Sequence, residues 1–303
     1  MFDPTLALAG LLVGFLVGLT GMGGGALLTP ILVLLFRVNP LTAISSDLLT
    51  SLVMKPVGAA VHAKRRTVHW RLTGWLVLGA VPAGFAGAVL IGLLGKGAGV
   101  SGNLKLMIGI ALVASVATTL FRQAMDRRAV RRGVVPDDAP IDVKPLRTVL
   151  IGVVGGLAVG MTSVGAGSLI IAMLLLAHPQ LHPSRLVGTD IVQAIPLVGA
   201  ATLGHLLFGD VSFGLAGALL VGALPGVWLG ARLSSAGSGR LIKPVVTGVL
   251  LASALSLLGV GQVATLAATA AVLVLTVALM PRRPSTDREA PSAEPERHLD
   301  PVG

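Results

Sequence analysis

The stretch GLTGMGGGALLTP, residues 18–30, decides the fold, because it places five glycines inside an otherwise apolar run. Glycine is among the least favourable residues in a helix interior, yet the surrounding block, residues 6–36, has the composition of a membrane span. As one straight helix this block would reach roughly 46 Å at about 1.5 Å per residue. The hydrocarbon core of a bilayer is only about 30 Å thick. We therefore expect the block to break at its glycines.

The composition of the whole chain points to a membrane protein. Of its 303 residues, 54% are hydrophobic and 12% are charged, and the mean hydropathy is +0.89. Soluble domains usually carry about 25% charged residues. The absence of cysteine excludes disulfides, thiolate metal sites and cysteine nucleophiles. The net charge of +10 comes mostly from residues between apolar blocks, which suits orientation in a lipid bilayer and not nucleic-acid binding.

Apolar blocks follow one another along the chain, most of them near the ~20 residues that a spanning helix needs. They cover residues 6–36, 41–62, 70–94, 103–121, 146–177, 185–207, 211–232, 241–260 and 262–280. The domain boundaries that follow are a first repeat (1–121), a basic cytoplasmic linker (122–145), a second repeat (146–260), an additional transmembrane helix (261–280) and a disordered cytoplasmic tail (281–303).

The opening stretch recurs in the second half of the chain as GMTSVGAGSLIIA, residues 160–172. The match continues in nearly the same register through Pro40 and Pro183, Asp47 and Asp190, His62 and His205, Gly79 and Gly222, Pro82 and Pro225, and Gly87 and Gly230. We therefore predict an all-α polytopic membrane protein with two homologous halves of four apolar blocks, each with a glycine-broken first helix, and one extra C-terminal helix.

The basic residues indicate how the glycine blocks cross the bilayer, since cytoplasmic loops collect Lys and Arg. If every block crosses once, the basic residues divide evenly between the two sides. If both glycine blocks turn back as hairpins, only Arg37, Lys96 and Lys105 remain on the side opposite the linker. This bias favours hairpins, and the second half is then an inverted repeat of the first.

The glycine breaks are the expected substrate site. Interrupted helices at matching positions of inverted repeats point to the binding site of a transporter, and the free N–H groups of a half-helix favour an anion. The glycines of GMGGG and of its partner serve this site, whereas Gly10, Gly14 and Gly18, spaced by four, favour helix packing. The predicted substrate-binding residues are Thr20, Gly21, Gly23, Gly24, Gly25, Lys55, Thr162, Ser163, Gly165 and Gly167.

Ionisable residues at membrane depth are candidates for coupling transport to a proton or another ion. Lys55 shares a helix face with Asp47 and is either a cationic ligand for the anion or the partner of that carboxylate. Asp47 and Asp190 have two readings, as helix N-caps or as proton carriers. His62 and His205 lie near block ends, where an interfacial role competes with a substrate or proton role. We expect no cofactor, no metal and no catalytic residues.

The pattern resembles the sulfite exporter TauE/SafE family. The resemblance covers about residues 6–260 and rests on the glycine-rich first helix, its repeat GLAVGMTSVGAGSLI (156–170), and the segments VPAGFAGA (81–88) and LPGVWLGA (224–231). It implies a permease of the bacterial inner membrane that carries small, often sulfur-containing anions such as sulfite, sulfonates or sulfoacetate as a secondary carrier. A homo-oligomer is compatible with it.

Two other functions compete with transport. A membrane-embedded enzyme would need a nucleophile and base, or a metal cluster such as HExxH, and the sequence contains neither pattern. An accessory or assembly protein without transport is the other alternative. The sequence also contains no P-loop, so ATP-driven transport would require a separate subunit.

Overall fold

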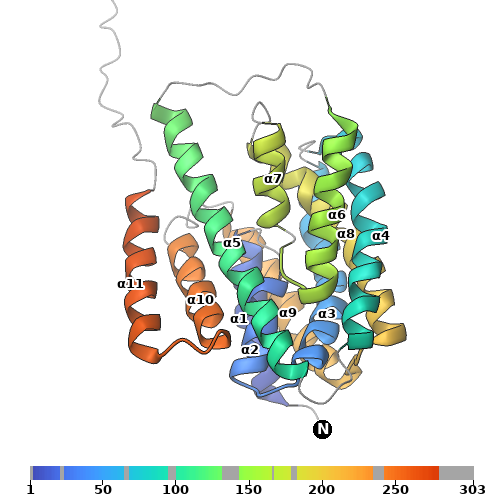
Figure 1. Ribbon diagram of the computed structural model, residues 1–303, viewed down its shortest axis with the longest axis vertical. Helices are drawn as coiled ribbons and strands as arrows, with labels where there is room; N and C mark the ends of the chain where they lie inside the picture. Colours follow the sequence, from blue (N-terminus) through green and yellow to red (C-terminus); the bar gives the residue numbers. More distant parts are fainter. Residues whose placement is uncertain are drawn as a thin grey trace, which may run out of the picture.

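The structure is a computed structural model that describes residues 3–20, 24–64, 68–94, 100–131, 143–165, 167–178, 183–234 and 242–279. These residues form eleven α-helices, packed as one bundle (Figure 1). The helices are α1 (Pro4–Thr20), α2 (Gly25–Leu34), α3 (Pro40–Lys64), α4 (Trp70–Leu94), α5 (Val100–Arg131), α6 (Pro145–Thr162), α7 (Leu169–Ala177), α8 (Pro183–Phe208), α9 (Phe213–Ser234), α10 (Ile242–Leu257) and α11 (Gln262–Ala278).

The helices have the length and composition of membrane spans. Five stretches are long and apolar enough to cross a bilayer, in α4, α5, α6, α8 and α9, and α1, α2, α10 and α11 contain shorter apolar helices. Large apolar side chains such as Trp228 and Val274 are exposed on the outside of the bundle, where lipid would solvate them. The prediction of an all-α polytopic membrane protein is confirmed.

Both glycine blocks break, so the predicted blocks 6–36 and 146–177 each become two helices, α1 with α2 and α6 with α7. The second break has an unusual backbone, because Ser163, Gly165 and Gly167 all have positive φ angles. Gly21 and Gly23, which belong to the first break, lie outside the described residues.

Helices α1 and α2 form a hairpin that returns to the end of the bundle where it began. Helix α1 lies parallel to α9, because Gly10 adjoins Leu219 and Gly18 adjoins Val227. The loop before α9 is hydrogen-bonded to the first two turns of α3, so α1, α9 and α3 all begin at one end. Helix α2 must therefore run back toward that end, as Figure 1 shows.

Helices α6 and α7 form a second hairpin, which starts from the opposite end. Helix α6 lies parallel to α4, with Gly152 beside Leu76 and Gly160 beside Gly84. Helix α8 also begins where α4 begins, because the residue before α4 donates its backbone N–H to the first turns of α8. Helix α7 must therefore return to the starting end of α6. The predicted hairpins are confirmed for both glycine blocks, and α1 and α6 run in opposite directions (Figure 1).

Glycines let two pairs of helices approach within backbone contact. A Cβ atom on Gly10, Gly14 or Gly18 of α1 would collide with the backbone of α9, which confirms the packing interpretation of these glycines. The matching interface joins α6 to α4 through Gly152, Gly156, Gly160, Gly79 and Gly87, at the sequence-matched positions. The duplication itself stays a prediction from the sequence, but helices that match in sequence form matching interfaces.

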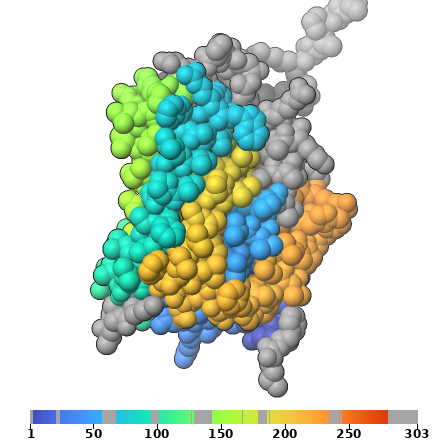
Figure 2. Space-filling model, turned by 90° about the vertical axis from the view of Figure 1, so that its right-hand side faces the viewer, coloured from blue at the N-terminus to red at the C-terminus, as the bar shows by residue number. Residues whose placement is uncertain are grey.

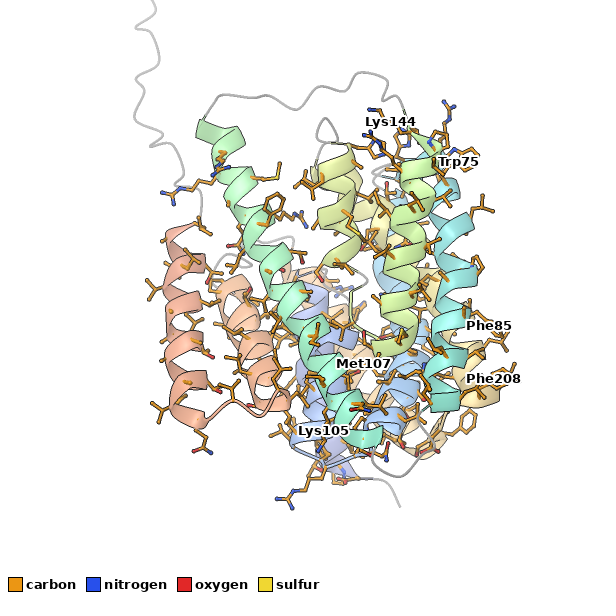
Figure 3. The ribbon with its side chains drawn as sticks, in the orientation of Figure 1. Trp75, Phe85, Lys105, Met107, Lys144 and Phe208 are labelled. Atoms are coloured by element: carbon orange, nitrogen blue, oxygen red, sulfur yellow. The ribbon has the colours of Figure 1, made fainter. Side chains whose placement is uncertain are left out.

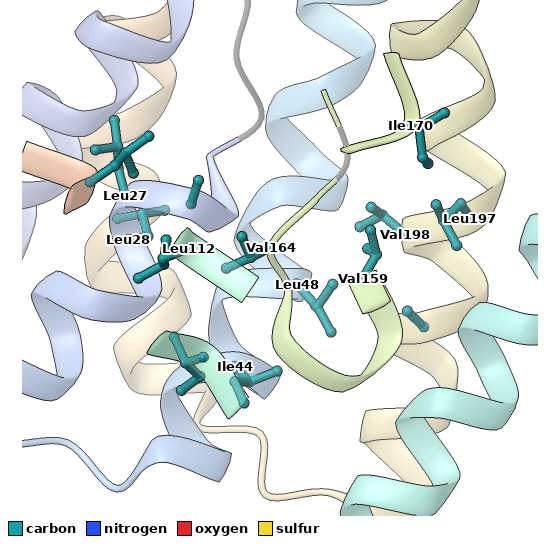
Figure 4. Packing of buried hydrophobic residues seen from close by; sticks show 14 of the residues in the cluster. Leu27, Leu28, Ile44, Leu48, Leu112, Val159, Val164, Ile170, Leu197 and Val198 are labelled. Atoms are coloured by element: carbon teal, nitrogen blue, oxygen red, sulfur yellow. The ribbon is translucent and has the colours of Figure 1, made fainter. Parts of the chain in front are cut away.

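Apolar side chains fill the space between the two hairpins. Figure 4 shows Val159 of α6 and Val164 of the second break, with Leu48 of α3 close to them. On the outside, Figure 2 shows α8 lying between α4 and α3, so the first and second halves interlock along this face. Helix α5 continues to Arg131, so residues 122–131, assigned to the linker from the sequence, are helical. Residues 132–142 and the tail from Met280 lie outside the described residues.

Candidate functional site

The two breaks meet inside the bundle. A Cβ atom on Gly25, the first residue of α2, would collide with the carbonyl and the hydroxyl of Ser163, the residue that ends α6. Gly24 adjoins α3, since its Cβ would lie 3.3 Å from the Ser51 hydroxyl. The structure therefore brings Gly24, Gly25 and Ser163 together, as a single site would require.

The predicted threonines serve the helix ends. Thr20 donates its hydroxyl to the Leu16 carbonyl at 2.7 Å, and Thr162 donates to the Ala158 carbonyl at 2.7 Å. The Thr162 oxygen also accepts the backbone N–H of Val164 at 3.2 Å, which closes the end of α6. Their hydroxyl hydrogens are thus directed at backbone carbonyls one turn earlier.

Gly165 and Gly167 shape the turn into α7. Their φ angles of 116° and 105° are in a region that L-residues rarely adopt, so glycine is required for this path. The Gly165 carbonyl accepts the backbone N–H of Leu169 at 3.1 Å. At the start of α7 the Ser168 hydroxyl lies 2.6 Å from that of Ser115 in α5, which anchors the hairpin to its neighbour.

Asp47 is fully buried in α3 beside the first break. Its carboxylate accepts the Thr29 hydroxyl of α2 at 2.6 Å and the Ser51 hydroxyl at 3.3 Å. The N-cap interpretation is wrong, because α3 begins at Pro40 and the carboxylate lies in the helix interior, bonded to side chains and not to the first backbone N–H groups. Thr29 is a neighbour that the sequence reasoning missed, although it lies in the glycine stretch as a polar residue in a short apolar helix.

Asp190 occupies the matching position in α8 and is also buried. It is not an N-cap either, since α8 begins at Pro183. Its Oδ1 accepts the side-chain amide of Gln193 at 3.1 Å, a partner that the sequence analysis did not identify. Lys55 and Arg122 interact with it electrostatically from α3 and α5.

Lys55 in α3 belongs to the same group of ionisable residues. It interacts electrostatically with Asp190 and with Asp47, and its side chain is partly exposed. Lys55 is therefore a partner not only of Asp47, as the sequence suggested, but also of Asp190 in the other half. Its partial exposure also agrees with the second interpretation, in which Lys55 is a ligand for the anion.

His205 ties the second hairpin to α3. Its Nε2 donates to the Gly160 carbonyl of α6 at 2.9 Å, and its Nδ1 lies 2.7 Å from the Ser45 hydroxyl. A carbonyl only accepts, so the proton is on Nε2. His62 lies in α3, but its side chain is outside what the structure describes.

The hairpin topology predicts that most basic residues lie at the end of the bundle where the linker lies. Lys144 and Lys105 lie at opposite ends (Figure 3). Lys144 is at the end where the linker enters α6, and Lys105 is at the end that carries few basic residues.

Comparison with known proteins identifies relatives among membrane transporters. The model of the family described as "Sulfite exporter TauE/SafE" matches residues 6–257. The "Probable membrane transporter protein YjnA" of Bacillus subtilis (strain 168) is 38% identical over 76% of this chain and 89% of its own length. YdhB of the same strain, with the same printed description, is 23% identical over 74% of this chain and 87% of its own length.

A further relative, the "Probable membrane transporter protein MJ0441" of Methanocaldococcus jannaschii, is 25% identical over 66% of this chain and 70% of its own length. No solved structure gives a significant match. The names of the family and of these relatives indicate a membrane transporter rather than an enzyme. With a family match that spans almost all of the helical bundle, the chain belongs to the sulfite exporter TauE/SafE family of membrane transporters.

Proposed function

We propose that the protein is a secondary transporter of small anions, and that its substrates are sulfur-containing, of the sulfite, sulfonate or sulfoacetate class. The observation that carries this proposal is the contact between Gly25 and Ser163, which joins the two interrupted helices at one place in the bundle. The family description, which names sulfite export, supports the substrate class. We place the protein in the inner membrane of a bacterium, with the basic linker in the cytoplasm.

The chemistry of the breaks suits an anion. The first N–H groups of a helix have no carbonyl one turn earlier within that helix, so in our proposal those of Gly25 and Ala26 at the start of α2 bind the anion. At the start of α7, by contrast, the N–H groups of Leu169 and Ile170 already bond to the Gly165 carbonyl. Glycine at position 24 allows an oxyanion to approach the backbone without a side chain in between, whereas the space beside Gly25 is filled by Ser163. Lys55, partly exposed on α3 one turn after Ser51, supplies the positive charge in our proposal.

The arrangement of the halves suits alternating access. Helix α1 of the first half packs on α9 of the second, and α6 of the second half packs on α4 of the first. The two halves therefore contact each other through two glycine-lined interfaces. In our proposal, the two halves are inverted repeats that rock about the contact between the breaks and expose it to each side in turn.

The test is anion flux into proteoliposomes that contain the purified protein. Sulfite, sulfoacetate, taurine, sulfate and acetate are compared with and without imposed ion gradients. Lys55→Gln is compared with Lys144→Gln, which removes the same charge from an exposed position at the start of α6. We expect saturable flux of a sulfur anion that Lys55→Gln reduces at least tenfold and Lys144→Gln leaves near the wild-type rate. Flux of no anion under any gradient would favour the accessory-protein alternative.

A further inference from the structure

Ser163 has a backbone conformation that normally belongs to glycine. It ends α6 with a φ of 59°, in the left-handed region. Residues with a Cβ atom seldom adopt this conformation, and such strain gathers at functional sites. The first half of the chain has Gly21 at the matching position. A side chain in this strained position indicates a functional role for the Ser163 hydroxyl.

The Ser163 hydroxyl is buried without a hydrogen bond. The residue is only 6% exposed, and among the described residues its Oγ has no partner in hydrogen-bonding geometry. The side chain nevertheless approaches the Asp47 carboxylate, through a contact that is too long or too poorly aligned to be a hydrogen bond. Buried hydroxyl groups normally have a partner, so this one points to a ligand between Ser163 and Asp47.

The other neighbours of the Asp47 carboxylate are also hydroxyl groups. Thr29 from α2 lies 2.6 Å from Oδ2, and Ser51 from α3 lies 3.3 Å from Oδ1. Because both carboxylate oxygens accept a hydrogen bond, the group is arranged as the ionised form. One carboxylate thus faces three hydroxyl oxygens that come from α2, α3 and the end of α6.

The buried Asp47 carboxylate shares the positive charge of Lys55 with the carboxylate of Asp190. Lys55 lies two turns further along α3 and interacts with Asp190 as well as with Asp47. Arg122 of α5 interacts with Asp190. A buried charge is costly unless a counter-charge lies close to it, and the hydroxyls around Asp47 carry no charge.

We propose that Asp47, Thr29, Ser51 and Ser163 form a binding site for Na⁺, and that this ion is the coupling ion of transport. An all-oxygen ligand set suits a hard cation. A single carboxylate with neutral hydroxyls matches one positive charge, whereas Ca²⁺ sites recruit several carboxylates. The coupling role rests on the proposed function, but the ion site itself does not.

The site explains how a cation would help an anion to bind. Gly24 of the first break adjoins Ser51, one of the ligands of the ion. Na⁺ at Asp47 neutralises the negative charge nearest to the glycine backbone, so an anion meets less repulsion there. Coupling between two binding sites is reciprocal, and the anion therefore raises the affinity for Na⁺ by the same factor.

The test measures binding of radioactive Na⁺ to the purified protein in detergent, without any anion substrate, at fixed pH and with choline to hold the ionic strength constant. We expect saturable binding that unlabelled Na⁺ displaces and K⁺ displaces poorly. Ser163→Gly suits the left-handed backbone and removes the hydroxymethyl side chain, so the fold should be kept while the apparent Kd rises about tenfold, or ~1.4 kcal/mol. Asp47→Asn should abolish binding.

Thr276→Val is the matched control, because the Thr276 hydroxyl in α11 bonds only within its own helix. It should bind Na⁺ like the wild type. No saturable Na⁺ binding to folded wild-type protein, or unchanged affinity in Ser163→Gly, would overturn the site. Anion flux without Na⁺ binding refutes this inference and leaves the proposed function intact. Na⁺ binding without flux of any anion supports the ion site and contradicts the proposed function, and with it the coupling role.

Discussion

Gly25 and Ser163 are in direct contact although they belong to different halves of the chain, and no side chain larger than hydrogen fits at Gly25. The contact lies where each hairpin is interrupted, at the start of α2 and at the end of α6. The start of α2 and the end of α6 thus cover one another inside the bundle, and protein surroundings are the condition under which interrupted helices are tolerated at membrane depth. The contact also links the two halves at the point where the proposed transport mechanism moves them.

Gly25→Ala should damage this contact. The added methyl group would collide with backbone atoms of Ser163, which cannot rotate away as a flexible side chain could. Overpacking of this kind costs about 1–3 kcal/mol, so we expect a lower thermal unfolding temperature and loss of anion flux. Gly102→Ala, where nothing lies within 4 Å of the new atom, is the control. A Gly25→Ala protein with wild-type stability and flux would refute the tight contact.

The interface between α1 and α9 gives a prediction with a control in the same helix. A methyl group on Gly226 would collide with the backbone of α1, whereas one on Gly217 meets open space. Gly226→Ala should therefore lower the unfolding temperature of the purified protein. Gly217→Ala should leave it unchanged or raise it slightly, because alanine is favoured over glycine in a helix by up to about 1 kcal/mol. Equal effects of the two substitutions would show that α1 does not pack on this face.

The hairpins could be predicted from the sequence because they depend on simple quantities. The length of block 6–36 exceeds the bilayer, its glycines mark where it breaks, and the distribution of Lys and Arg selects the path that returns. None of these requires knowledge of which helices are neighbours. The break points and the directions of α1 and α6 follow from them.

The surroundings of the carboxylates could not be predicted in the same way. The triplets SSD and GTD look like helix starts, but Pro40 and Pro183 already begin α3 and α8, and proline in the first turn is a strong start signal. That Thr29 reaches Asp47 depends on how α2 folds back onto α3. Such contacts between helices arise from the packing of the hairpins and have no local signal in the sequence.

The topology gives a prediction that uses the absence of cysteine from the chain. Single cysteines at Gly102 and Gly214, both exposed and without close neighbours, should react with a membrane-impermeant thiol reagent from the same side of the membrane. A cysteine at the exposed Lys144, at the other end of the bundle, should react only from the opposite side (Figure 3).

The alternative topology makes the contrary prediction for this experiment. If each glycine block crossed the membrane once, the loop before α9 would lie on the side opposite the start of α5. Labelling of Gly102→Cys and Gly214→Cys from different sides would therefore rule out the hairpins. Labelling in intact cells and in inverted vesicles separates the two cases.

His205 should stabilise the end of α6. The Gly160 carbonyl lies in the last turn, and the Val164 N–H, which would continue the helix, bonds to the Thr162 hydroxyl instead. The Nε2–H of His205 takes the place of that donor. In His205→Phe the carbonyl is left without this donor in an apolar interior, so we expect a loss of about 1–2 kcal/mol in the free energy of unfolding.

Two further variants separate this hydrogen bond from simple packing. His205→Gln retains an amide that can donate to the Gly160 carbonyl, and we expect it to recover part of the stability. Because Ser45 lies 2.7 Å from Nδ1, Ser45→Ala and His205→Phe should be non-additive in a double-mutant cycle, with a coupling near the ~0.6 kcal/mol average for hydrogen bonds in membrane proteins. Additive effects, together with no recovery in His205→Gln, would mean that the ring serves only to fill space between α8, α3 and α6.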